Sequence, residues 1–157
     1  MKIKLYLIGK TDKSGIQKPI DEFTKRISRY IKFETVIIPE LKNTSALSTQ
    51  EQKRKEGEIL LSKLKPNEHL ILLDENGKNY TSVEFANFIE KQMIQSVQTL
   101  SFVVGGPYGF SGDVYNAAKG KISLSAMTFS HQIIRVIFAE QLYRAFTIIR
   151  NEPYHHA

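Results

Sequence analysis

Short apolar runs alternate along the chain with longer segments in which apolar residues recur every three or four positions. The short runs are rich in β-branched residues or alternate with polar ones, as Ile3, Leu5 and Leu7 do, which predicts strands. The predicted strands cover residues 1–9, 33–38, 69–73, 100–104 and 121–124.

The longer segments have helical spacing. They predict helices over residues 19–31, 48–65, 81–93, 114–118 and 129–150. Ser48 with Glu51, and Thr81 with Glu84, have the spacing of capping boxes at helix starts. The intervening segments predict a polar loop over 41–48, a turn over 74–77 and a glycine-rich loop over 105–112.

Strands separated by helices indicate βαβ units, a parallel sheet and the α/β class. A chain of 157 residues with no repeat and no linker is expected to form one domain over residues 1–157. The helix over 129–150 is apolar almost all round, so it is either a central core helix or an oligomer interface, and we favour the interface.

Composition narrows the classes of function. There is no cysteine, which excludes disulfides, thiolate nucleophiles and zinc–thiolate sites. We expect no membrane segment, because no apolar run approaches about 18 residues, and no export signal, so the expected location is the cytoplasm. The net charge of +6 favours an anionic partner, of which nucleic acid is the commonest.

Three segments that follow strands are candidates for ligand binding, because ligands bind at the carboxyl ends of parallel strands. They are residues 72–77, 105–109 and 124–129. The glycines of 105–109 allow close backbone approach, although they match neither a GxGxxG motif nor a phosphate loop. Ser125 and Thr128 could instead simply cap the next helix.

The last third of the chain concentrates ionisable residues. His131 and Arg135, and likewise Glu140 and Arg144, are four residues apart and share a helix face. The tail that follows carries Tyr154, which could stack on a base, and two histidines, a residue type that accepts protons near neutral pH. No set of residues has the spacing of a metal site.

In order and spacing, these segments resemble the RlmH family of SPOUT methyltransferases over essentially the whole length. The matching stretches are the strand to Gly9, Leu72-Leu73-Asp74 with Gly77, Gly105-Gly106-Pro107 with Gly109, Leu124-Ser125-Ala126-Met127-Thr128 with His131, Arg135-Val136, Ala139 to Ala145, and Pro153-Tyr154-His155.

The resemblance implies an α/β-knot fold with a C-terminal trefoil knot, a homodimer, and S-adenosylmethionine as cofactor. It also implies methylation of N3 of a pseudouridine in 23S ribosomal RNA of the large subunit. The cofactor contacts that it implies fall on Leu73, Gly105, Leu124, Ser125, Ala126, Met127, Thr128 and Phe129.

Candidates for the chemistry on the RNA are Arg135, Glu140, Arg144, Tyr154 and His155. We expect Tyr154 and His155 to reach the other subunit's cofactor pocket. Arg144 would bind phosphate or the developing anion, and Glu140 would orient Arg144.

The resemblance implies no separate RNA-binding domain, so basic residues such as Lys10, Lys13 and Lys18 are expected to contact RNA, and an assembled ribosome is the expected substrate. Three alternatives remain open: a SPOUT enzyme that modifies another RNA position, a non-catalytic RNA-binding or ribosome-associated module, and a flavodoxin-like nucleotide-binding protein.

Overall fold

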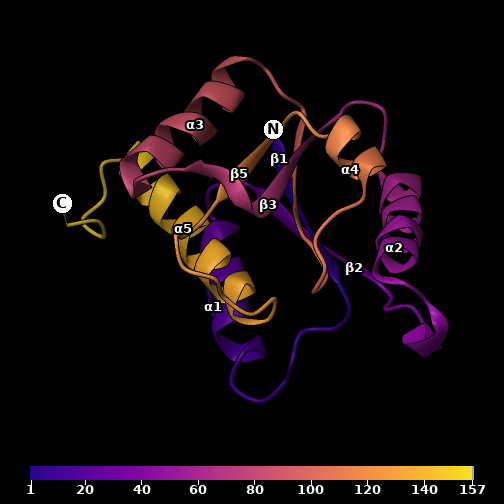
Figure 1. The fold of residues 1–157 in the computed structure, drawn as a ribbon. Coiled ribbons are helices and arrows are strands. Elements are labelled where there is room, and N and C mark those ends of the chain that lie inside the picture. Colours follow the sequence, from indigo (N-terminus) through magenta and orange to yellow (C-terminus); the bar gives the residue numbers. More distant parts are fainter. Residues whose placement is uncertain (157) are drawn as a thin grey trace.

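Five parallel strands form the centre of the molecule (Figure 1). The computed structural model describes residues 1–156. The strands are β1 (Lys2–Ile8), β2 (Lys32–Ile38), β3 (Glu68–Asn79), β4 (Thr99–Val104) and β5 (Gly120–Ser123). The helices are α1 (Gln17–Ile27), α2 (Thr49–Lys63), α3 (Ser82–Ile94), α4 (Gly112–Ala117) and α5 (Ile133–Ile149), with a 3₁₀ turn, η1, at Thr44–Ala46.

The strand order is β2-β1-β4-β3-β5, and every pairing is parallel. This confirms the predicted α/β class and the parallel sheet. Because all five strands point the same way, the loops that follow β1, β3, β4 and β5 gather at one edge of the sheet. Strand order and register do not define how the chain is threaded, so the trefoil knot stays a prediction.

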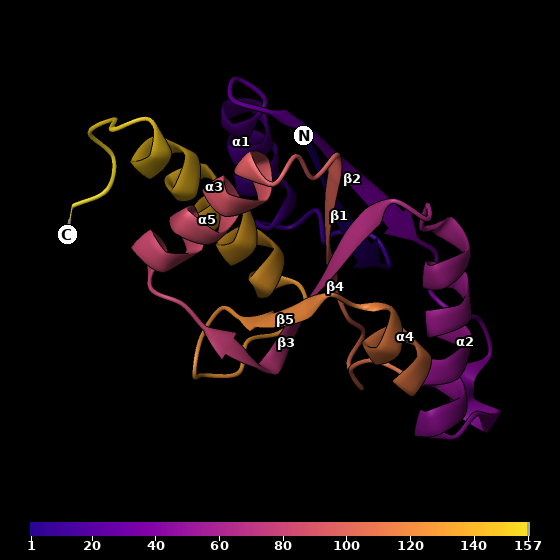
Figure 2. The ribbon, with the colours of Figure 1, turned by 90° about the horizontal axis from the view of Figure 1, so that it is seen from above.

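Helices cover both faces of the sheet. Viewed from above, α1, α3 and α5 lie on one face and α2 and α4 on the other (Figure 2). Alternate residues of each strand face opposite layers, so Leu5 and Phe102 belong to the core under α5, whereas Tyr6 and Val103 belong to the core under α2.

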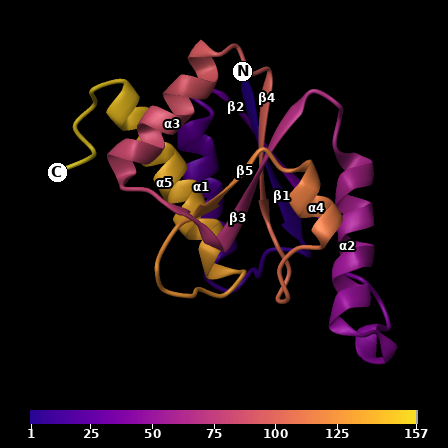
Figure 3. The same cartoon turned by 45° about the horizontal axis from the view of Figure 1, so that its top comes forward.

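Helix α5 packs between α1 and α3 (Figure 3), which explains much of its all-round apolar character. Phe138, Leu142 and Phe146 are buried against the sheet and the neighbouring helices. Ile133 remains 41% exposed. The core-helix alternative is therefore confirmed for one side of α5.

Two predicted helices begin or end at the wrong residue. The first stops at Ile27 rather than at residue 31, because the hydroxyl of Ser28 donates to the carbonyl of Thr24 and the chain turns there. The last begins at Ile133 rather than at residue 129. Its first turn is capped by Ser130, whose hydroxyl accepts the Ile133 amide at 3.2 Å.

Some of the helix caps predicted from the sequence are present and others are not. Ser125 and Thr128 do not cap α5: the Ser125 hydroxyl instead accepts the amide of Met127 at 2.9 Å. Thr81 and Glu84 form the full capping box of α3. Ser48 caps α2 by accepting the Glu51 amide, which is one half of the predicted box.

The turn predicted over residues 74–77 is wrong, because β3 continues to Asn79 through an irregularity. Leu73 and Lys78 both pair with Ile122 of β5, so the residues between them are extra on the β3 side. The Oδ1 atom of Asp74 accepts the amide of Asn76 at 2.8 Å and closes this bulge. The turn chemistry was identified correctly, but it bends a strand instead of ending it.

Candidate functional site

An open pocket of about 510 Å³ lies at the carboxyl edge of the sheet. Its walls are the bulge of β3, the segments that follow β4 and β5, Tyr115 of α4, and residues 130, 131 and 134 at the start of α5. The sheet order explains this convergence, since β4, β3 and β5 are neighbours. The three ligand-binding segments that the sequence predicts therefore form one site.

Most of the residues that the resemblance assigns to the cofactor line this pocket. They are Leu73, Gly105, Leu124, Ser125, Met127, Thr128 and Phe129. Ala126 belongs to the same segment but is not part of the pocket wall. The roles of all eight residues in binding stay predictions.

The bulge of β3 provides an acidic wall. Asp74 accepts a hydrogen bond from the hydroxyl of Tyr115, on α4, and Glu75 accepts one from the Thr128 hydroxyl at 3.3 Å. Burial, reinforced by the bond to Asp74, raises the pKa of Tyr115 to about 12, so this phenol keeps its proton. These bonds tie the segment after β3 to α4 and to the segment after β5.

The glycine-rich wall is shaped by close approach and by one tight turn. A Cβ atom on Gly106 would lie 2.8 Å from a carboxylate oxygen of Glu56, which is buried beneath the loop. Burial raises the pKa of Glu56. Gly109 has a φ of +81° and donates its amide to the Gly106 carbonyl at 3.2 Å, so the turn needs glycine there.

The composition of the pocket wall indicates its ligand. Within residues 1–156 the wall carries two carboxylates and neither lysine nor arginine, although the whole protein is basic. The volume lies in the usual range of about 300–1,000 Å³ for small-molecule sites. Such a wall favours a ligand with a positively charged part and disfavours a phosphate-bearing nucleotide, which weakens the flavodoxin-like alternative.

A second cluster lies at the C-terminal end of α5, and Glu140 is its centre. The Oε1 atom of Glu140 accepts bonds from Arg144 Nε at 3.0 Å, from Arg144 Nη2 at 2.5 Å and from the Tyr154 hydroxyl at 3.1 Å. Gln141 donates to its other oxygen at 2.8 Å. The Nδ1 atom of His155 lies 3.3 Å from Arg144 Nη1.

Electrostatics in this cluster keep the protons on Arg144 and Tyr154. The bond to Glu140 raises the pKa of Arg144, so the guanidinium stays charged. Burial and the negative charge of Glu140 raise the pKa of Tyr154, so the phenol stays protonated. Tyr154 also lies under the guanidinium, 4.7 Å from its carbon, and packs edge-on against Tyr143.

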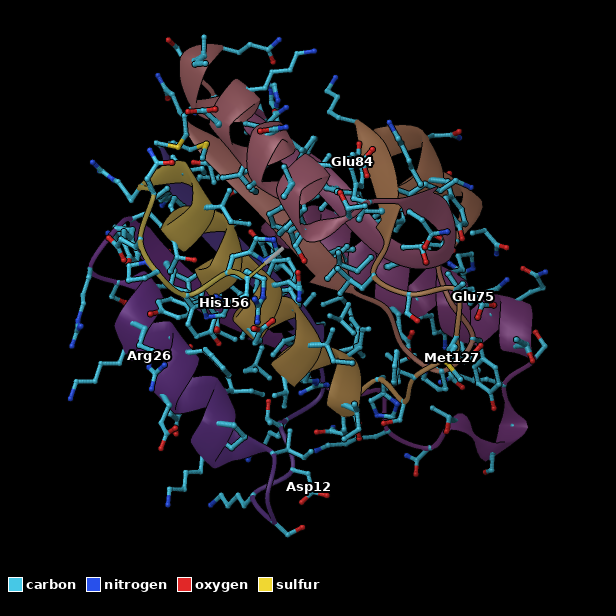
Figure 4. All side chains as sticks on the ribbon, turned by 90° about the vertical axis from the view of Figure 1, so that its left-hand side faces the viewer. Asp12, Arg26, Glu75, Glu84, Met127 and His156 are labelled. Carbon is cyan, nitrogen blue, oxygen red and sulfur yellow. The ribbon has the colours of Figure 1, made fainter. Side chains whose placement is uncertain are left out.

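The cluster and the pocket of one chain lie at opposite ends of α5. His131 and Ile134, at the start of the helix, line the pocket, whereas Arg144 belongs to its last turns. Ten helical residues span about 15 Å. Figure 4 shows Glu75 and Met127 together on one side and His156 well apart from them. The structure thus assembles four of the five predicted catalytic residues, but away from their own pocket.

Arg135 is separate from both groups. It is 1% exposed, and its guanidinium donates to the carbonyls of Ile8 at 2.8 Å and Gly9 at 3.1 Å and to the Thr11 hydroxyl at 3.0 Å. Burial lowers the pKa of Arg135. With its donors engaged by the end of β1, the side chain is placed to hold the fold and not to contact RNA.

Several residues of the pocket wall were not named individually as site residues. Asp74, Glu75 and Tyr108 lie within the predicted ligand-binding segments, whereas Tyr115, His131 and Ile134 lie outside them. The position of Asp74 directly after a predicted strand was a usable signal. Tyr115 carried none, because it reaches the pocket only through the packing of α4 beside β3.

No helix within the described chain is long and apolar enough to cross a membrane. Across residues 1–156, no group of three or more histidine, aspartate or glutamate side chains is arranged to hold a metal ion.

Comparisons with known proteins agree with this geometry. The chain is 60% identical over 156 residues to a protein named Ribosomal RNA large subunit methyltransferase H from Flavobacterium johnsoniae, and 59% identical to one of the same name from Flavobacterium psychrophilum. Each match covers 99% of both chains.

The fold is similar to that of a probable methylase family protein from Haemophilus influenzae, with a TM-score of 0.50 and 14% identity. That match covers 95% of this chain and 66% of the other. A family model described as "Predicted SPOUT methyltransferase" matches residues 1–155. The chain therefore belongs to the SPOUT methyltransferase family.

Proposed function

We propose that this protein transfers a methyl group from S-adenosylmethionine to N3 of a pseudouridine in 23S ribosomal RNA. The observation that carries the proposal is the acidic pocket at the carboxyl edge of the sheet, in a chain 60% identical over its length to a ribosomal RNA large subunit methyltransferase. The substrate is the assembled ribosome, so the protein acts in the cytoplasm. The pseudouridine itself rests on the resemblance to the RlmH family.

The pocket fits the cofactor by size and charge. When bound, S-adenosylmethionine supplies an electrophilic methyl group on a positively charged sulfonium. Leu73, Gly105 and the segment 124–129 would hold it, and Asp74 and Glu75 would favour its positive charge. Gly105 and Gly106 let the loop pack closely on Phe110 and Glu56, which shapes this wall of the pocket.

The active site is completed by a second subunit. Arg144, near the end of α5, and Tyr154 and His155, beyond it, lie too far from the pocket of their own chain to reach it, so the tail of one protomer reaches the pocket of its partner. Ile133 and Met127, both exposed in the single chain, supply apolar surface for a homodimer. Each dimer then has two composite sites.

The residues of the tail have distinct tasks in methyl transfer. The imide N3 of pseudouridine is a poor nucleophile until it loses its proton, so a base must accept that proton. Tyr154 and the charged Arg144 cannot accept it, because both keep their protons. The oxygens of Glu140 are already engaged by Arg144, Tyr154 and Gln141. We therefore assign the acceptor role to His155. Arg144 stabilises the negative charge that develops on the base, and Tyr154 provides a stacking face.

The test is methyl transfer from labelled S-adenosylmethionine to ribosomes from cells that lack the native modification, followed by mapping of the labelled nucleotide. One N3-methylated pseudouridine is the expected product, and ribosomes already carrying the methyl group should take up no label. Label at another base would replace the proposed target. Absence of label with folded protein would overturn the activity in favour of an RNA-binding module.

A further inference from the structure

The loop between β1 and α1 is fastened to the first turn of α5 by two side chains, Gln132 and Arg135, called here the latch. Gln132 engages the loop backbone at two points: its Oε1 accepts the Asp12 amide at 2.8 Å, and its Nε2 donates to the Lys10 carbonyl at 3.2 Å. The amide side chain thus pairs with the loop as a neighbouring strand would.

Arg135 also fastens the loop, and its contacts begin just before Lys10, at the carbonyls of Ile8 and Gly9. Its three donating nitrogens reach the Gly9 and Ile8 carbonyls, the Thr11 hydroxyl and, within α5, the His131 carbonyl at 3.0 Å. The ion pairs of residues 1–156 do not include Arg135. Burying a charge among neutral acceptors alone costs free energy, but it fixes the position of α5 relative to the loop.

The turn of α5 that holds the latch also forms part of the pocket wall. Ser130, His131 and Ile134 line the pocket, and Gln132 and Arg135 alternate with them in sequence. Arg135 binds the carbonyl of His131 directly, so a shift of the loop and a shift of the pocket wall are mechanically connected.

The fastened loop is the basic element that we expect to contact RNA. Lys10, Lys13 and Lys18 are exposed, and the ion pairs found in residues 1–156 leave all three out. Asp12, the acidic residue among them, is also exposed, and the amide and hydroxyl of Ser14 donate to its Oδ1. With Lys10 and Lys13 in the loop and Lys18 in the first turn of α1, lysines outnumber this one carboxylate.

We propose that Gln132 and Arg135 are positioning residues that couple RNA docking on the β1–α1 loop to cofactor binding in the pocket. The inference rests on the proposed function. Coupling of this kind is reciprocal: if the cofactor orders the loop, then RNA on the loop tightens the cofactor by the same factor.

Amide hydrogen exchange of the full-length protein tests the coupling without any turnover. Saturating S-adenosylmethionine should slow exchange at the Gln17 amide, which donates to the Asp12 carbonyl and not to Gln132, about fivefold or more in the wild type. In Gln132→Ala that slowing should disappear, while the cofactor Kd changes by less than about threefold. Gln92→Ala on α3, outside the latch and the pocket, is the matched control and should behave as the wild type.

The RNA side of the coupling is measured by binding to ribosomal large subunits. S-adenosylmethionine should tighten binding of the wild type about fivefold or more, and the gain should be lost both in Gln132→Ala and in Lys10→Ala/Lys13→Ala, but not in Lys91→Ala at the opposite end of the molecule.

Three results would overturn parts of this inference in distinguishable ways. Cofactor binding that leaves loop exchange unchanged in the wild type would overturn the coupling alone. Protection that persists in Gln132→Ala would overturn the role of Gln132. Failure of S-adenosylmethionine to bind the wild type would instead overturn the proposed function, and the coupling with it.

Discussion

Single carboxylates organise the polar interior of this protein. Glu140 aligns Arg144 and Tyr154 at the end of α5, and Glu68 gathers three donors beneath the sheet. In each case one side chain satisfies partners that are distant in sequence or belong to different elements. Removing the charge of such a carboxylate while keeping its shape isolates its electrostatic role.

At Glu140, we expect Glu140→Gln to lower kcat about tenfold to hundredfold, because hydrogen bonds to a charged group contribute about 1.5–3 kcal/mol. The cofactor Kd should not change, since Glu140 lies away from the pocket of its own chain. Steady-state methyl transfer and calorimetry measure the two quantities.

The control for Glu140→Gln is Glu58→Gln, which breaks the exposed Arg54–Glu58 pair of the same spacing on α2. It should leave kcat unchanged. Equal losses in the two variants would show that Glu140 has no special part in the reaction.

At Glu68, the buried carboxylate accepts bonds from Lys4 at 2.5 Å, Ser101 at 2.7 Å and Tyr6 at 2.9 Å. Burial alone would raise the pKa of Glu68, but these bonds outweigh it and lower that pKa. A lowered folded-state pKa contributes stability above about pH 4.3, the unfolded value, and that contribution is lost as pH falls through the folded pKa.

We therefore expect Glu68→Gln to reduce the free energy of unfolding by about 3 kcal/mol at pH 7, because Lys4 is left buried without a counter-charge. The difference from the wild type should shrink as pH is lowered toward about 2. Urea unfolding measures both. Glu34→Gln, in an exposed pair with Lys32, should cost less than about 1 kcal/mol; a loss as large as that of Glu68→Gln would contradict the argument.

Among the elements, β3 both pairs in the sheet and forms part of the pocket wall. Its first half pairs in the sheet, its bulge turns Asp74 and Glu75 toward the pocket, and its last residues pair with β5 again. The bulge depends on Gly77, where a Cβ atom would lie 2.6 Å from the backbone of Ile122. Strand pairing and pocket shape are therefore linked at this glycine.

We expect Gly77→Ala to separate β3 from β5 and to lower stability by about 1–3 kcal/mol through overpacking. The cofactor Kd should rise about tenfold, because the acidic wall moves. Thermal unfolding and calorimetry provide the two values. Gly112→Ala, whose Cβ atom meets nothing within 4 Å, is the control; an unchanged cofactor Kd in Gly77→Ala would separate the bulge from the pocket.

At the scale of the whole molecule, α5 sets the distance between the pocket and the tail cluster. The pocket lies at the start of α5, whereas Arg144, Tyr154 and His155 lie toward and beyond its end. A rigid helix cannot bring its own ends together. The proposed function therefore requires that a second chain bring its tail cluster to each pocket.

Mixed dimers test this directly. Gly105→Leu, whose side chain would displace Phe110 in the pocket wall, and His155→Ala, which removes the proton acceptor, should each be inactive alone. An equal mixture with exchanged subunits should recover about one quarter of wild-type activity, because half the dimers contain one intact composite site. Activity no higher than that of the separate variants would show that pocket and tail act within one chain.

Much of the local structure could be predicted from the sequence, because it depends on neighbours in the chain. The alternation of Ile3, Leu5 and Leu7 identified β1, and Thr81 with Glu84 identified the start of α3. The glycine-rich loop and the segment 124–129 could be predicted to line a ligand site because each follows a strand. Residue spacing and capping chemistry act over a few residues, so they can be recognised from the sequence alone.

The remaining features were decided by contacts between distant residues. Arg135 was expected at the RNA and lies instead under the end of β1, because the acceptors that hold it are more than a hundred positions away. Ala126 sits in the predicted segment but outside the pocket wall, since the turn at Ser125 determines which side chains face inward.

The sequence by itself determined the α/β class, the order of elements and the family, because each depends on local spacing or on residue identity. The tertiary structure alone decided the strand order β2-β1-β4-β3-β5, the bulge of β3 and the separation of Arg144 from the pocket. These depend on which surfaces meet when the chain folds, and a local pattern does not specify a partner that lies many residues away.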